Sequence, residues 1–157
     1  MTQHQKVLFN QLESYRHDLL AVVEGLSNQQ ANIIPQGFHN NIRWNLGHVY
    51  LDQFLWIETL TKERTAVPEH FAQWFGFGTS PKDFTEETPS FEELKHLLKT
   101  QPSFIKNTYQ SRLDEVFEPV EMGMRTIEDV LVRTIFHEGM HVQAIMDLRK
   151  FITDNRP

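Results

Sequence analysis

The chain has 157 residues, which is enough to build one hydrophobic core and too few for two, so we expect a single domain over residues 1–157. Fifteen Lys and Arg against 21 Asp and Glu give a formal net charge of −6, which argues against binding nucleic acid or an anionic membrane surface. The sequence contains no cysteine. This excludes disulfides, a protein thiol nucleophile and cysteine-ligated zinc sites, so any metal ion must be bound by His, Asp or Glu.

The N-terminal residues lack the apolar core and the small-residue cleavage site of a secretory signal peptide. Nowhere do 18 apolar residues follow one another, as a membrane-spanning helix would require. We therefore expect a cytoplasmic, soluble protein with no membrane partner.

Two amphipathic segments open the chain. Apolar residues spaced by three or four predict a first helix over residues 4–26. A stretch with Pro35 and Gly37 follows. Asn40 or Asn41 can then cap a second helix from about Ile42 to Lys62.

The second half of the chain shows a similar pattern after a long interruption. Prolines and glycines between residues 64 and 89 predict a long loop. Ser90 and Glu93 form a capping box for a third helix over residues 91–112, with a bend expected at Pro102. Residues 113–125 have room for a short extended piece, and a fourth helix is predicted from Ile127 to Ile152. The fold class is therefore all-α, a four-helix bundle with a long connection between its second and third helices.

The second predicted helix is apolar on both sides. At 100° per residue, Trp44 and Leu51 lie within about 60° of His48, whereas Tyr50 and Ile57 lie opposite. A helix that is apolar all round is covered on every side. One face should build the core, and the other should meet either the long loop or a second subunit.

The chain contains eight histidines, and three of them are candidate metal ligands. His137 and His141 are four residues apart on one helix face, a spacing that lets two imidazoles bind one cation. About 0.4 such pairs would arise by chance, so the spacing alone is not diagnostic. The pair also lies within the apolar stripe of the fourth helix, where two imidazoles without polar partners would be costly to bury.

His48 is the candidate third ligand, because it is the other histidine inside a helix that has apolar residues on its own face. Gly47 beside it permits close packing at that level. Three protein ligands and an open position are typical of catalytic rather than structural zinc sites. Buried structural histidines, or a purely structural metal, are the alternatives.

Residues 137–141 read HExxH, the zinc-protease signature. We reject that reading. The longer metzincin form requires Gly and His where Ala144 and Asp147 stand, and no His or Glu follows His141 to complete the ligand set. No strand pattern indicates a sheet that would hold a peptide substrate.

The segments NIRWNLGHV at 41–49 and FHEGMHVQAI at 136–145 together resemble the DinB superfamily, with its bacillithiol- and mycothiol-dependent transferase branches. The resemblance implies a four-helix bundle that binds a divalent ion, commonly zinc or nickel, through His48, His137 and His141. It also implies a homodimer. Family members often carry a basic residue soon after the second histidine of the pair, where this chain has Val142 and Gln143.

The resemblance predicts a metal-dependent transferase that adds a low-molecular-weight thiol cosubstrate to an electrophilic small-molecule substrate. Because the chain has no cysteine, the thiolate must come from the cosubstrate. A metal-dependent hydrolase and a non-catalytic, dimeric metal- or ligand-binding module stay open as alternatives. The sequence assigns no catalytic residue.

Two acidic residues and one aromatic segment adjoin the predicted site. Asp52, one helical turn after His48, and Glu138, next to His137, can each orient a ligand or act as a base, or simply form ion pairs elsewhere. The aromatic residues of the long loop can line the mouth of a pocket or form a hydrophobic plug that closes one end of the bundle; they are His70, Phe71, Trp74, Phe75 and Phe77.

Overall fold

The computed structural model describes residues 1–154, and all regular secondary structure in them is helical, which confirms the predicted all-α class. The elements are α1 (Gln3–Ala21), α2 (Asn28–Ala31), α3 (Ile42–Thr61), α4 (Phe71–Phe75), the 3-10 helix η1 (Pro81–Asp83), α5 (Phe91–Tyr109), the 3-10 helix η2 (Glu121–Gly123) and α6 (Ile127–Asp154). None of the described helices combines the length and the apolar character needed to cross a lipid bilayer.

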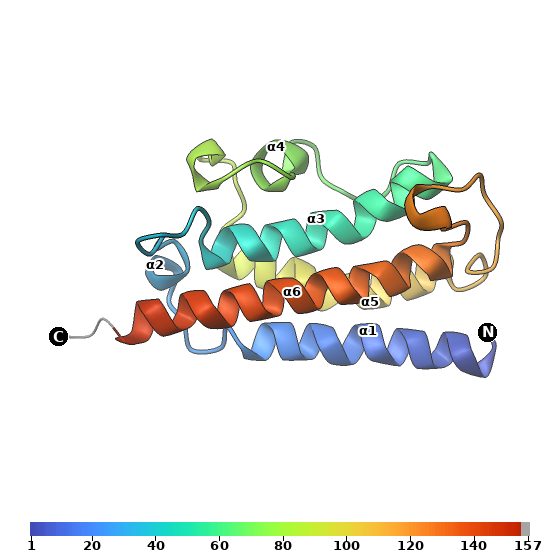
Figure 1. Ribbon diagram of the computed structural model, residues 1–157, viewed down its shortest axis with the longest axis horizontal. Helices are drawn as coiled ribbons and strands as arrows, with labels where there is room; N and C mark the ends of the chain where they lie inside the picture. The colour runs from blue at the N-terminus through green and yellow to red at the C-terminus, as the bar shows by residue number, and fades with distance from the viewer. Residues whose placement is uncertain (155–157) are drawn as a thin grey trace.

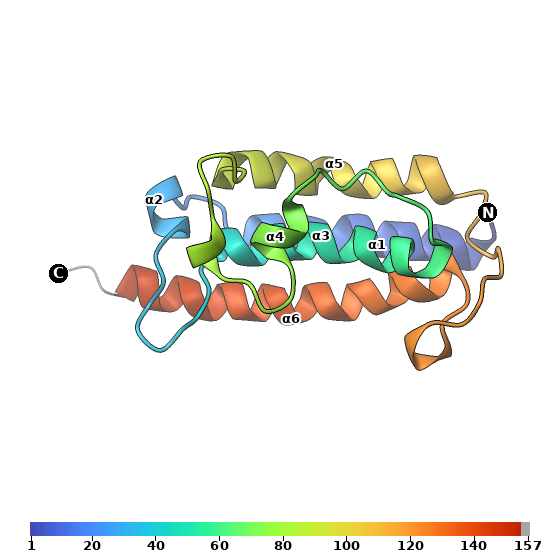
Figure 2. The same cartoon turned by 90° about the horizontal axis from the view of Figure 1, so that it is seen from above.

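The four long helices lie side by side as a bundle (Figures 1 and 2). The chain between α3 and α5 runs back along α3, so that α5 points in the same direction as α3, while α1 and α6 point the other way (Figure 2). This is the four-helix bundle with a long second connection that the sequence predicts. Each long helix contributes large apolar side chains to one continuous core, among them Phe9, Phe54, Leu98 and Ile145.

Helix starts follow the predicted caps. The side chain of Asn41 accepts the backbone N–H of Trp44 at the start of α3. Ser90 and Glu93 form the expected reciprocal capping box of α5. In each case a side-chain oxygen satisfies an N–H that has no partner within the helix, which explains why these starts are readable from the sequence.

Helix ends and connections differ from the prediction in several places. The first helix ends at Ala21 rather than 26, and the last three residues predicted for the third helix, 110–112, lie outside α5. The long loop contains α4 and η1. Residues 113–125 form no strand: two backbone hydrogen bonds, Phe117 N to Arg125 O at 2.8 Å and Val120 N to Met124 O at 2.9 Å, close a turn around η2.

The second apolar face of α3 is covered by α4. The ring centres of Tyr50 on α3 and Phe71 on α4 are 5.4 Å apart. Phe71, Trp74 and Phe75 are all buried. The sequence predicts that either the long loop or a second subunit covers this face, and in the structure the long loop covers it. The aromatic segment thus packs on the side of α3 rather than closing an end of the bundle (Figure 2), and Phe77 is fully exposed at 100%.

A buried cation ties the four long helices together. Arg16 on α1 is 2% exposed, and its guanidinium donates hydrogen bonds to each of the other three long helices. The acceptors are both carboxylate oxygens of Glu138 on α6 at 2.7 and 3.2 Å, the carbonyl of Leu98 and the side-chain oxygen of Gln101 on α5 at 2.8 and 2.9 Å, and the side-chain oxygen of Gln53 on α3 at 3.2 Å. Such a charge is tolerable inside a bundle because its hydrogen-bonding capacity is met.

One of these acceptors exists because of a proline. Pro102 lies inside α5 and has no N–H to donate to the carbonyl four residues earlier, which belongs to Leu98. The guanidinium of Arg16 donates to that carbonyl instead. The proline therefore creates a binding point for the arginine.

Replacing Arg16 with Met should destabilise the fold by about 3–5 kcal/mol, because it leaves the carboxylate of Glu138 buried without its partner. The free energy of unfolding in urea measures this. Replacing Glu138 with Leu in the same chain should recover part of the loss.

The matched control is Lys106→Met, which breaks the half-exposed pair between Lys106 and Glu13 at 3.7 Å. We expect a change within about 0.5 kcal/mol. Equal losses for the two variants would contradict a central role for Arg16.

Candidate metal centre

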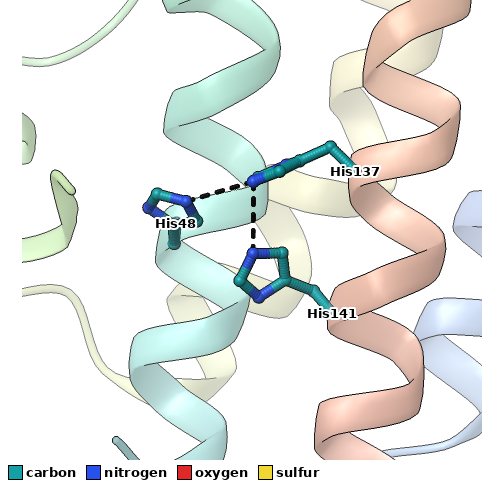
Figure 3. Close-up of side chains that lie close together, drawn as sticks. All are labelled: His48, His137 and His141. Carbon is teal, nitrogen blue, oxygen red and sulfur yellow. Dashed lines mark hydrogen bonds between the residues drawn. The ribbon is translucent and has the colours of Figure 1, made fainter.

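Three imidazoles from two helices meet inside the bundle (Figure 3). His48 on α3 and His137 on α6 are 9% and 8% exposed, and His141 is half-buried. The Nε2 atom of His137 lies 3.2 Å from Nε2 of His48 and 3.2 Å from Nε2 of His141. Among the described residues these three form a group whose ligand atoms all lie within 4.8 Å of one another.

Each ring is held from its other nitrogen by a hydrogen-bond acceptor. His48 Nδ1 lies 2.6 Å from the carbonyl oxygen of Phe75, and His137 Nδ1 lies 2.9 Å from a carboxylate oxygen of Asp52. His141 Nδ1 lies 2.7 Å from the side-chain oxygen of Asn45. The amide of Asn45 is oriented in turn, because its Nδ2 donates to the carbonyl of Asn41 at 2.8 Å.

These partners determine the tautomer. A carbonyl, a carboxylate and an amide oxygen can only accept, so each Nδ1 carries a proton and donates it. The neutral rings then present three Nε2 lone pairs to one another. The carboxylate–histidine contact is a typical support for a metal ligand, since it orients the ring and raises its basicity.

Facing lone pairs need a cation between them. A proton on one Nε2 forms a hydrogen bond to only one other nitrogen. A divalent ion can be coordinated by the lone pairs of all three nitrogens at once. Two nitrogens that each lie about 2.0–2.1 Å from a tetrahedral zinc ion are about 3.3–3.4 Å apart, close to the 3.2 Å seen here. The residues present therefore fit a divalent ion bound by three imidazoles.

Burial keeps the rings of His48 and His141 uncharged. Desolvation is the main cause that lowers the pKa of His48, against the opposing effect of its hydrogen bond to Phe75. Desolvation is also the main cause that lowers the pKa of His141, to about 3. Both rings are thus neutral at physiological pH, the form in which imidazole binds a metal.

Asp52 is the acidic residue of the site. Burial alone would raise the pKa of its carboxyl group, but the hydrogen bond from His137 and the positive charge of Arg133 outweigh burial and lower it. Arg133 donates from Nη1 to Asp52 Oδ2 at 2.6 Å, and Trp56 donates to Oδ1 at 3.2 Å. The guanidinium of Arg133 also lies 4.3 Å from the centre of the Trp56 ring.

Gly47 allows the third acceptor to reach its ring. A Cβ atom at this position would lie 2.3 Å from atoms of the Phe75 ring, so only glycine permits α4 to pack this closely on α3. The carbonyl oxygen of the same Phe75 accepts from His48. The indole of Trp44 covers the other side of the site. It is stacked on the His48 ring, with 4.7 Å between the ring centres and 10° between the ring planes.

Comparison with known proteins agrees with this architecture. The chain matches the DinB superfamily over residues 11–145. It belongs to that superfamily. Among solved structures it is similar to the conserved protein of locus from Enterococcus faecalis, with a TM-score of 0.72 and 14% sequence identity over 99% of this chain and 100% of that one. No match was found among curated proteins.

The structure brings together the three histidines chosen from the sequence of this DinB superfamily protein; that they bind a metal stays a prediction. Asp52 orients His137. Glu138, the other acidic candidate, is 3% exposed and faces Arg16 rather than the imidazoles. Because Glu138 directly follows His137, its side chain points about 100° away from that of His137 around the axis of α6.

Three supporting groups were not predicted. Asn45 lies three residues before His48 and so on the same face of α3. This spacing is the one signal for Asn45 in the sequence. The carbonyl of Phe75 has no signature in the sequence. Arg133 lies one turn before His137 on α6. Its role could be predicted only by knowing that it faces Asp52 on α3.

Gly47→Ala should destabilise the fold by about 1–3 kcal/mol, because the new methyl group forces the Phe75 ring away. It should also weaken metal binding, since His48 loses its acceptor. Urea unfolding and titration with Zn²⁺ measure the two effects.

Gly139→Ala is the matched control, because Gly139 is an exposed glycine of α6 where an added Cβ meets nothing within 4 Å. That variant should gain about 0.5–1 kcal/mol from helix propensity. If both variants gain stability, the close packing at Gly47 is not required.

Asp52→Ala should lower the affinity for Zn²⁺ about 10- to 100-fold, because the ring of His137 loses the acceptor that orients it. Competition with a chromophoric chelator measures the affinity. Asp147→Ala removes a surface carboxylate from the same α6 helix and should leave the affinity unchanged. Equal affinities in the two variants would exclude an orienting role for Asp52.

Proposed function

We propose that this DinB superfamily protein is a metal-dependent transferase that joins a low-molecular-weight thiol to an electrophilic small molecule. The observation that carries the proposal is the convergence of three Nε2 lone pairs whose rings are each held at Nδ1. Three protein ligands leave room for an exogenous ligand, as in catalytic zinc sites. Superfamily membership supports the same reading.

The chain's own residues prepare the site. Asp52, Asn45 and the carbonyl of Phe75 hold the Nδ1 protons and so keep every Nε2 free. Trp44 excludes water from one side of His48. A divalent ion such as zinc or nickel, when bound there, supplies the charge that lowers the pKa of a coordinated thiol towards neutrality.

The transfer itself needs no protein nucleophile. The thiol proton is lost to solvent, the thiolate sulfur forms a bond to the electrophilic carbon, and the bond from that carbon to its leaving group breaks with the electron pair on the leaving group. The absence of cysteine in the chain is consistent with a cosubstrate that provides the sulfur.

His141→Ala should abolish transfer to chlorodinitrobenzene, lowering the rate by about 100-fold or more, because one of three ligands is removed. The assay follows the thioether product by absorbance, with protein loaded with Zn²⁺ or Ni²⁺ and a panel of small thiols. Metal content is measured for every sample.

His17→Ala is the control, since it removes an exposed histidine of α1. Ester cleavage without added thiol would support a hydrolase instead. Absence of turnover with every thiol and ester tested, in protein that binds metal, would support a non-catalytic binding module. A melting temperature that collapses on chelation, with no exchangeable coordination position, would indicate a structural metal.

We also propose a homodimer with no nucleic-acid partner. The dimer cannot use the outer face of α3, because α4 covers it. Sedimentation velocity at micromolar concentration should show twice the chain mass. A monomer under those conditions would remove this part of the proposal.

A further inference from the structure

A groove opens on the outer face of α6 beside His137, one of the three candidate metal ligands. It has a volume of about 660 Å³ and lies between the first half of α6, the segment around η2 and the start of α1. His137 is one of its lining residues. A ligand in this groove would therefore lie next to one of the candidate metal ligands.

The walls of the groove carry an exposed apolar stripe. Val132, Phe136 and Met140 recur every four residues on one face of α6 and are 51%, 71% and 49% exposed. Met122 in η2 faces the same groove and is 73% exposed. Four large apolar side chains left exposed side by side are typical of a surface that binds an apolar ligand.

Arg133 adds a positive charge beside the metal centre. Its side chain is 25% exposed and lines the groove. Among the described residues its hydrogen bonding is a single contact, from Nη1 to Asp52. The remaining N–H donors of the guanidinium are available, and their fork geometry matches a carboxylate.

Carboxylates also line the groove, and Asp129 lies one helical turn before Arg133 on α6. Glu128 accepts from Gln5 at 3.4 Å and pairs with His4 at 3.1 Å, while Asp129 caps α6 through the N–H groups of residues 125 and 126. Glu121 adds a third negative charge there. These carboxylates repel a second anionic group, so the groove favours a ligand that carries a single anionic group.

We infer that the groove binds the small-molecule substrate as an apolar monocarboxylate, with its carboxylate on Arg133 and its apolar part along Phe136, Met140 and Met122. The inference rests on the proposed function, since it names the class of substrate for the same site. It assigns Arg133 and Phe136 to substrate specificity rather than to metal binding.

The test compares two probes of equal size, 4-phenylbutyrate and its uncharged amide, by calorimetric titration of the full chain with and without metal. The carboxylate should bind at least about tenfold more tightly than the amide. Arg133→Gln should remove this difference, and Arg133→Lys should retain part of it. Phe136→Ser should weaken both probes alike.

Two features of the design keep the result interpretable. Because Arg133 also contacts Asp52, metal content is measured in each variant, and the two probes are compared within one variant. Lys99→Gln, on the exposed side of a separate groove between α1 and α5, is the control and should change neither affinity.

Three results would overturn the inference. Equal affinities for the two probes would exclude recognition by Arg133. Binding that is lost with the metal but survives Arg133→Gln would place the carboxylate on the ion. A dimer that Phe136→Ser dissociates, with probe binding unchanged, would make the stripe a subunit interface. Failure of thiol transfer alone would leave probe binding through Arg133 intact, so the two proposals fail separately.

Discussion

The arrangement of the bundle depends on the buried guanidinium of Arg16. Its donors reach α3, α5 and α6 together, and a change in the position of any of these helices would leave a charged or polar group buried without a partner. Its strongest contact is with Glu138, the residue that follows His137. By holding Glu138 towards α1, the arginine sets the rotation of α6 that turns His137 and His141 towards α3.

The orientation of the rings decides what the histidine cluster can do. If the three buried imidazoles carried their protons on Nε2, these N–H groups would face one another without acceptors, and the rings could not bind a metal ion. Here every Nδ1 has an acceptor within 2.9 Å, so the lone pairs point inward. The acceptors come from α3 and from the segment that covers it, which links the candidate metal centre to the packing of α4 at Gly47.

The sequence predicts what is local and periodic. Helix positions follow from apolar spacing, their starts from caps such as Ser90 with Glu93, and the three candidate ligands from histidines in apolar stripes. It does not predict contacts between residues far apart in the chain. The pairing of Arg16 with Glu138, 122 residues away, has no local signature, and neither has the carbonyl of Phe75 that accepts from His48. Leu98 shows the limit: Pro102 predicts an unpaired carbonyl, but only the fold shows which donor reaches it.

The letters HExxH illustrate why a motif needs its surroundings. In a zinc protease the glutamate acts as a base beside the metal. Here the same residue, Glu138, is buried against Arg16, which accepts no proton and holds both carboxylate oxygens. The carboxylate that does face the imidazoles, Asp52, comes from the other helix and is held by His137 and Arg133. The chain therefore keeps the two histidines of the motif, but the glutamate that would act as the base of a zinc protease is held in a buried ion pair with Arg16.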